Sequence, residues 1–107
     1  MNSEKYFGLG DSVLYAPHGV NDLINGKTIT KEGLRNILSI SPNWLASESG
    51  DSFVSAWTRI DLWPDCAKIT FDHYRIDEFL VPYDRLRVYK EWLCAFLYEG
   101  MEVRVNL

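Results

Sequence analysis

Cysteine and histidine are scarce in this chain, whose 107 residues include only Cys66, Cys94, His18 and His73. Their order along the sequence contains none of the short Cys and His pairings that zinc modules use, so the sequence predicts no metal site. A domain of this length in which 47% of the residues are hydrophobic does not need a disulfide for its stability. We therefore expect both cysteines to be free thiols.

Long hydrophobic runs are also missing. The most apolar segment, 92–98, is far shorter than the roughly 18 residues that a membrane-spanning helix needs. The segment 1–6 lacks the basic start and the apolar core of a signal peptide. We expect a cytoplasmic location and no membrane partner.

Basic residues are outnumbered, because 11 Lys and Arg face 15 Asp and Glu, which gives a formal net charge of −4. Proteins that bind nucleic acid directly, or anionic membranes, normally carry a basic excess. The charge balance therefore argues against direct nucleic-acid binding. Carboxylates concentrate in 61–78, together with Arg59, Lys68 and Arg75. This region is read either as a solvated face of mixed charge or as a surface that recognises a basic partner.

Catalytic motifs are absent from the sequence. The segment 26–28, Gly-Lys-Thr, resembles the end of a phosphate-binding loop, but Asn21 stands where that loop needs a glycine. No G-x-S-x-G nucleophile elbow surrounds any serine. His73 is expected to be a half-buried, hydrogen-bonded residue rather than a general base. We predict that the protein is not an enzyme and has no cofactor.

Periodicity predicts the secondary structure of a single domain, 1–107, because no repeat or linker divides the chain. A helix is expected over 31–40, with Thr30 as its N-cap and Leu34, Ile37 and Leu38 on one face. A second, longer helix is expected over 85–99 after Asp84, with Leu93, Phe96 and Leu97 buried at the centre of its apolar stripe.

Strands are expected over 12–16 and 44–47, over an alternating segment 53–62, and over 67–73 and 101–107. The segment 74–82 fits either a helical turn or an edge strand. The expected fold class is α+β, an antiparallel sheet of four to five strands with two helices packed mainly on one face.

Aromatic residues are the most informative feature, because four Trp, six Tyr and five Phe exceed the needs of a small core. Within 53–62 the alternation places Val54, Ile60 and Leu62 on one face and the odd-numbered residues on the other. Aromatic residues ringed by charge are typical of protein-binding hot spots. The competing interpretation is that the N-terminal segment or the first helix covers this face. The predicted partner-binding residues are Phe53, Trp57, Arg59, Asp61, Trp63, Lys68 and Asp72.

The segment 10–20 reads Gly-Asp-Ser-Val-Leu-Tyr-Ala-Pro-His-Gly-Val. It resembles the opening of the RNA-polymerase-interacting domain of CarD-type transcription regulators, which has a G-D-x-V-x-Y start and an H-G-V segment. Pro17 is displaced by one position, and Asn21 stands where that family has a glycine. The resemblance covers 11 of the 107 residues, and it implies transcription-complex binding as a minor alternative.

Together, these features favour a non-enzymatic protein-binding module, a small acidic inhibitor or immunity-type protein that blocks a partner protein. Acidic inhibitors suit basic, nucleic-acid-handling targets, because complementary charge speeds encounter and aids selectivity. The alternative is a homo-oligomeric structural or assembly subunit that buries the same aromatic residues against itself. A small enzyme or ligand binder built around His18 or His73 is a minor alternative.

Overall fold

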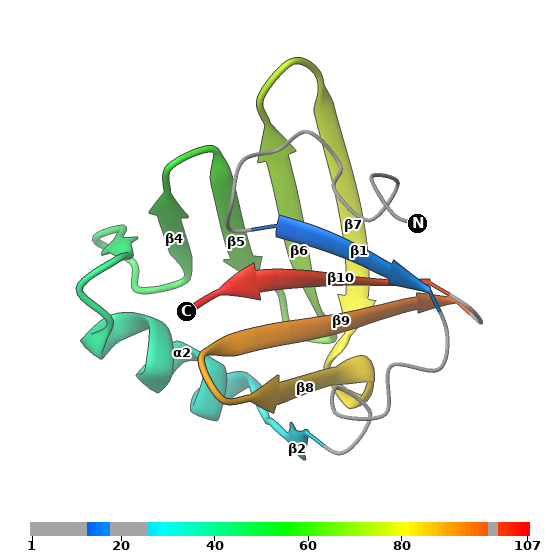
Figure 1. Ribbon diagram of the computed structural model, residues 1–107. Coiled ribbons are helices and arrows are strands. Elements are labelled where there is room, and N and C mark those ends of the chain that lie inside the picture. The colour runs from blue at the N-terminus through cyan, green and yellow to red at the C-terminus, as the bar shows by residue number, and fades with distance from the viewer. Residues whose placement is uncertain (1–12, 18–25, 99–100) are drawn as a thin grey trace.

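Two antiparallel sheets form the protein in the computed structural model, which describes residues 13–17, 26–98 and 101–107 (Figure 1). Each sheet has five strands. The first sheet has the order β1 (Val13–Pro17), β10 (Met101–Asn106), β9 (Trp92–Tyr98), β8 (Leu86–Tyr89) and β2 (Lys27–Thr28). The second has the order β3 (Leu45–Ala46), β4 (Ser52–Ser55), β5 (Thr58–Leu62), β6 (Cys66–Asp72) and β7 (Ile76–Pro82).

The hydrophobic core lies between the two sheets. In Figure 1 the strands of the first sheet run in front of those of the second and across them, and the helix α2 (Lys31–Ile40) lies at one edge of the pair. The second sheet turns Ile60, Ile69 and Phe71 inward, and the first sheet turns Leu93 and Val105 inward. All five are at most 1% exposed. The α+β class is therefore confirmed, whereas the expected single sheet is two sheets, and α2 is the one α-helix in the described residues.

Helix α2 begins and ends where its sequence signals place it. The N–H of Gly33 donates to Thr30 Oγ1 at 3.1 Å, which satisfies one of the amides that the first turn leaves unpaired. Leu34 and Leu38 are fully buried. The helix ends at Ile40, two residues before Pro42, a residue that disfavours helix at the position before it.

The expected helix over 85–99 is wrong, because this segment forms the hairpin β8–β9, preceded by a short 3-10 helix, η2 (Tyr83–Arg85). Asp84 lies in η2 and is no helix N-cap. Lys90, with φ of 55°, lies in the turn that pairs Tyr89 with Trp92. Leu93 is fully buried as expected, while Phe96 and Leu97 are half-buried. The apolar residues of 92–98 stand on both faces of the segment, as in a strand that is covered on both sides. Their spacing is therefore compatible with a strand as well as with a helix.

The expected single strand over 53–62 is also wrong. It is the hairpin β4–β5, whose two-residue turn contains Ala56 with φ of 46°. The turn pairs Phe53 with Ile60, so both point the same way, and Phe53 is fully buried. The segment 74–82, which was compatible with either structure, contains strand β7, and the expected strands at 67–73 and 101–107 correspond to β6 and β10.

Replacing Leu93 by Ala tests this packing. The substitution removes a fully buried side chain from β9, so we expect the free energy of unfolding to fall by about 2–5 kcal/mol in urea denaturation. Leu80, which is 57% exposed on β7, supplies the control, and Leu80→Ala should leave the midpoint nearly unchanged. Equal midpoints for Leu93→Ala and the parent would contradict the packing.

Candidate functional site

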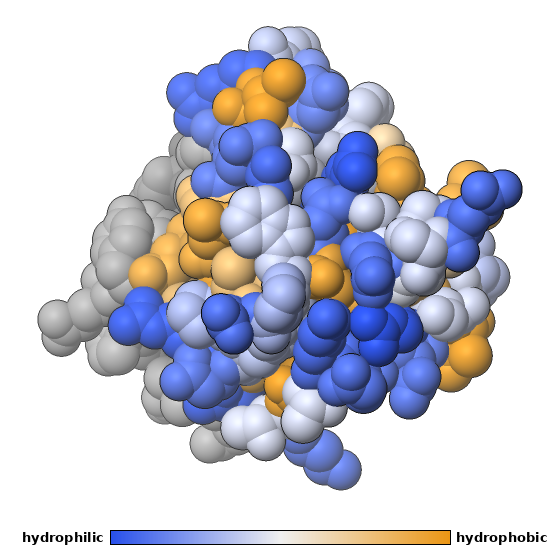
Figure 2. Space-filling view, turned by 180° about the vertical axis from the view of Figure 1, so that it is seen from behind, coloured by the Kyte–Doolittle hydropathy of each residue, from blue (hydrophilic) through white to orange (hydrophobic). Residues whose placement is uncertain are grey.

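Exposed hydrophobic side chains gather on the outer face of the second sheet, the side turned away from the core. Figure 2 shows the molecule from behind, where hydrophobic patches stand among hydrophilic residues. Among the described residues, all but one of the strongly exposed large hydrophobic side chains lie on the second sheet or its turns; the exception is Ile40 of α2. The members of this set are Leu45, Val54, Trp57, Trp63, Tyr74, Ile76 and Leu80.

Strand register explains why these side chains share one face. Leu45 pairs with Val54, Val54 with Arg59, and Arg59 with Thr70. Partners across an antiparallel pair point to the same side of the sheet. Because Phe53 and its neighbours in register fill the core, this row must face outward.

Charged groups on the outer face are paired with one another. Arg59 Nε lies 3.1 Å from Asp61 Oδ1, which also accepts a hydrogen bond from the Ser52 hydroxyl. Lys68 Nζ lies 3.4 Å from Glu78 Oε2 and 5.6 Å from the centroid of the Trp63 ring. Pairs this exposed contribute little to stability, so their main effect is to orient the side chains.

Three stacked rings join two turns at one end of this face. Trp57, in the β4–β5 turn, stacks on His73 with centroids 4.2 Å apart and an interplanar angle of 9°. His73 stacks in turn on Tyr74, with centroids 4.1 Å apart. The backbone N–H of Asp72 donates to the carbonyl of Trp57 at 2.8 Å, which fixes the two turns together. His73 is half-buried, as expected.

A groove of about 370 Å³ opens beside Trp57. Its volume lies at the lower end of the roughly 300–1,000 Å³ typical of ligand sites. Trp57 and Asp72 both line it, and the remaining lining residues are Val54, Ala56, Thr58, Arg59 and Thr70. The groove is therefore lined by an aromatic residue, small apolar residues, an arginine and an aspartate.

The structure distributes the predicted site residues unevenly. Trp57, Arg59, Trp63 and Asp72 are exposed on the outer face or its turns, and Lys68 and Asp61 lie there half-buried. Phe53 does not share this face, because the turn at Ala56 reverses the chain and directs Phe53 into the core.

Sequence reasoning missed Leu45, Tyr74, Ile76 and Leu80 as members of the face. It also placed Val54 on the face of Ile60 and Leu62, which is wrong, because the turn at Ala56 pairs Val54 with Arg59 and directs it outward. Ile76 and Leu80 alternate with Asp77 and Phe79, which is typical of a strand. The same residues also fit a helical turn, so the sequence did not decide which way they point. The stack of Trp57 on Tyr74 through His73 joins two turns and left no local signal in the sequence.

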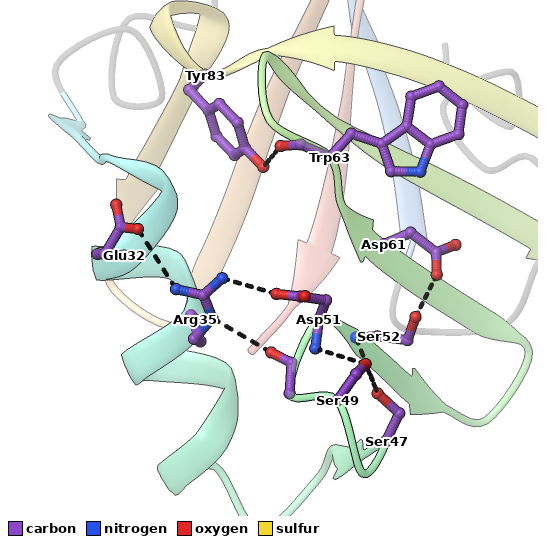
Figure 3. A network of polar contacts seen from close by, with 10 residues as sticks. Glu32, Arg35, Ser47, Ser49, Asp51, Ser52, Asp61, Trp63 and Tyr83 are labelled. Carbon is purple, nitrogen blue, oxygen red and sulfur yellow. Dashed lines mark hydrogen bonds and ion pairs between the residues drawn. The ribbon is translucent and has the colours of Figure 1, made fainter.

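A polar network joins the turn before β4 of the second sheet to helix α2 (Figure 3). Arg35 Nη2 lies 2.7 Å from Asp51 Oδ1, and Arg35 Nε donates to the carbonyl of Gly50 at 3.3 Å. Hydrogen bonding from Arg35 lowers the pKa of Asp51. Gly50, with φ of 77°, adopts the left-handed conformation that glycine tolerates best. The turn that leads into β4 is thereby tied to the helix.

Tyr83 secures the turn that carries Trp63. Its hydroxyl donates to the carbonyl of Trp63 at 2.7 Å (Figure 3). Burial raises the pKa of Tyr83 to about 12, so the phenol remains a donor at neutral pH. Trp63 is therefore presented by a braced turn.

A second polar cluster lies on the outer side of the first sheet. Glu102 is 3% exposed, and Glu102 Oε2 and Arg104 Nε have no hydrogen-bond partner within the described part of the chain. Burial raises the pKa of Glu102 to about 7, with Arg104 opposing the shift. The Arg104 guanidinium lies 5.2 Å from the centroid of Trp92. Cys94 pairs with Arg104 in the sheet and is fully buried.

Comparisons with protein-family models, curated proteins and solved structures find no match. Within the ranges that the structure describes, no cluster of three or more His, Cys, Asp or Glu residues could hold a metal ion. No helix in those ranges is long and apolar enough to cross a bilayer. His18 and most of the segment that resembles CarD-type regulators lie outside the described residues.

Replacing Glu102 by Gln tests the burial of its carboxyl group. The folded-state pKa is raised, so the protonated form stabilises the fold below about pH 4.5, and this contribution is lost as the pH rises through about 7. We expect Glu102→Gln to gain stability relative to the parent between pH 5 and pH 8, by up to about 3 kcal/mol. Urea titrations across this range measure the difference, with exposed Glu91→Gln as the control. A difference that does not change with pH would refute the assignment.

The two cysteines should differ in reactivity. Both are free thiols, Cys66 half-buried and Cys94 fully buried with a pKa raised to about 12, mainly by burial. Thiolate is the reactive form, so a disulfide reagent at pH 8 should modify Cys66 in the folded protein and both cysteines in urea without reductant. Cys66→Ser should abolish the reaction of the folded protein. Fewer than two thiols in urea would contradict this assignment.

Proposed function

We propose that this chain is a non-enzymatic protein-binding module that uses the outer face of the second sheet to block a partner protein. One observation carries the proposal: the strongly exposed large hydrophobic side chains of the described residues concentrate on this sheet and its turns. Exposed apolar side chains that gather on one face are a feature of interaction sites on soluble proteins. An extended sheet face suits a flat protein surface better than a small molecule.

The composition of the face supports protein recognition. Trp57 and Trp63 are 48% and 43% exposed, and tryptophan is enriched in interface hot spots. The Arg59–Asp61 and Lys68–Glu78 pairs supply a polar surround. Large rings that hold few rotatable bonds lose little entropy when a partner covers them.

The acidic balance favours a basic partner. The formal net charge is −4, and complementary charge accelerates encounter while it disfavours other acidic proteins. An inhibitor of a basic, nucleic-acid-handling protein fits this balance without contacting nucleic acid itself. We place its action in the cytoplasm.

A homo-oligomer is the second candidate. The outer face alternates opposite charges in Arg59, Asp61, Lys68 and Glu78, and a two-fold interface requires a self-complementary surface of that kind. Sedimentation velocity at two concentrations decides between the candidates. A mass that doubles from the lower to the higher concentration would favour self-association, provided that the Trp57→Ala variant stays a monomer at both concentrations.

Affinity capture supplies the partner for the main proposal. Parent protein, Trp57→Ala and the control Ile40→Ala serve as baits, since Ile40 is 82% exposed on α2, away from the face. A protein held by the parent and by Ile40→Ala, but released by Trp57→Ala, is the expected partner. Equal capture by all three baits would contradict the proposal.

Direct binding of the purified partner then tests Trp57. We expect Trp57→Ala to weaken binding by about 2 kcal/mol, the usual cost of truncating a hot-spot residue. The same substitution removes the stack on His73. Because Trp57 is half exposed, this loss should lower the free energy of unfolding by only about 0.5–1.5 kcal/mol. Calorimetry and urea denaturation measure the two effects. A loss of stability that matches the loss of binding would assign Trp57 to the core instead.

A further inference from the structure

We propose that the groove beside Trp57 receives an arginine side chain of the partner protein. The inference rests on the proposed function and specifies the chemistry at one end of the outer face. Trp57 would stack against the guanidinium, and Asp72 would pair with its charge.

Asp72 supplies the charge argument. It is exposed and it lines the groove. The ion pairs between described side chains are Arg35 with Glu32 and Asp51, Arg59 with Asp61, Lys68 with Glu78 and Arg75 with Asp77, so none of them uses Asp72. Arg59 also lines the groove, but its Nε lies 3.1 Å from Asp61, so its charge is already compensated. Arg75, in the adjacent turn, is likewise paired with Asp77. Two cations, Arg59 and Arg75, against three carboxylates, Asp61, Asp72 and Asp77, leave this end of the face with a net negative charge, which suits a cationic ligand group.

Trp57 supplies the stacking argument. His73 stacks on the Trp57 ring system, and the groove is lined by Trp57 and not by His73. A guanidinium in the groove would therefore use the part of the indole that His73 leaves uncovered. Tryptophan is the best aromatic partner for a cation held over its ring. Val54 and Ala56 also line the groove and offer apolar contacts to the methylene stem of a long side chain.

Geometry favours arginine over lysine. A planar guanidinium stacks on an aromatic ring and offers a fork of N–H donors to a carboxylate at the same time, whereas an ammonium is a point charge. The hydrogen bond from the Asp72 N–H to the Trp57 carbonyl joins the backbones of the two residues that carry the recognition groups. The site therefore suits a ligand group that stacks on the Trp57 ring and pairs with the Asp72 carboxylate at the same time.

The test uses acetyl-Gly-Arg-Gly-amide as the probe and the indole N–H signals of the ¹⁵N-labelled protein as the readout. Trp57→Phe identifies the Trp57 signal among the four tryptophans. We expect a saturable shift of Trp57 with weak affinity, and binding at least about 3-fold weaker for the peptides in which citrulline or lysine replaces arginine.

Asp72→Asn is the matched variant and should also bind the arginine peptide about 3-fold more weakly. Asp65→Asn is the control, because Asp65 is exposed and does not line the groove. Denaturation midpoints verify that both variants fold. An unshifted Trp57 signal, equal affinity for the citrulline or lysine peptide, or an unchanged affinity of Asp72→Asn would overturn the proposal.

The two proposals fail separately. If Trp57→Ala releases a captured partner while the arginine peptide shows no preference, the groove assignment is wrong and the binding face stands. If the peptide binds through Asp72 but the Trp57→Ala bait captures the same proteins as the parent, the groove binds arginine and the protein-docking function is wrong.

Discussion

Burial of Phe53, Ile60 and Leu93 between two crossed sheets is the constraint on which the rest of the structure depends. Side chains alternate along a strand, so each residue committed to the core sends its neighbours to the opposite face. In the second sheet those neighbours include Val54 and Arg59, and no described element covers that side. The apolar outer face is thus a direct consequence of how the core is filled.

Polar contacts then fix the positions of turns that the packing of the core does not determine. Arg35 ties the turn before β4 to helix α2, and Tyr83 ties the turn after β5 to the segment that leads into the first sheet. Both contacts act on turns, where strand pairing alone gives little control. The candidate site is also carried by turns, with Trp57 and Trp63 at opposite ends of β5. The turn of Trp63 is held by Tyr83, and the turn of Trp57 is held by the backbone hydrogen bond from Asp72. Rigid presentation of these rings lowers the entropic cost of binding.

The sequence predicted correctly those elements that are determined by interactions between residues close together in the chain. Helix α2 has a capping residue, a one-sided apolar stripe and Pro42 beyond its end, and its predicted bounds were confirmed. The hairpin β8–β9 was missed because the apolar residues of 92–98 satisfy helical and strand spacing equally. The turn at Ala56 was missed because it lacks the glycine or asparagine that usually marks positive φ, and Phe53 was therefore assigned to the wrong face. Arg59 and Trp63 were placed correctly because both follow that turn.

The position of β10 in the first sheet affects the order in which the molecule can assemble during synthesis. The second sheet joins consecutive strands by short turns, so its pairings become available one after another as the chain emerges. The first sheet is different, because β10 lies between β1 and β9 although it follows every other strand in the sequence. Until β10 has been made, β1 lacks the one described strand that it pairs with, and the core-facing side of the second sheet lacks part of its cover. Completion of the first sheet therefore waits for β10, the last of the described strands.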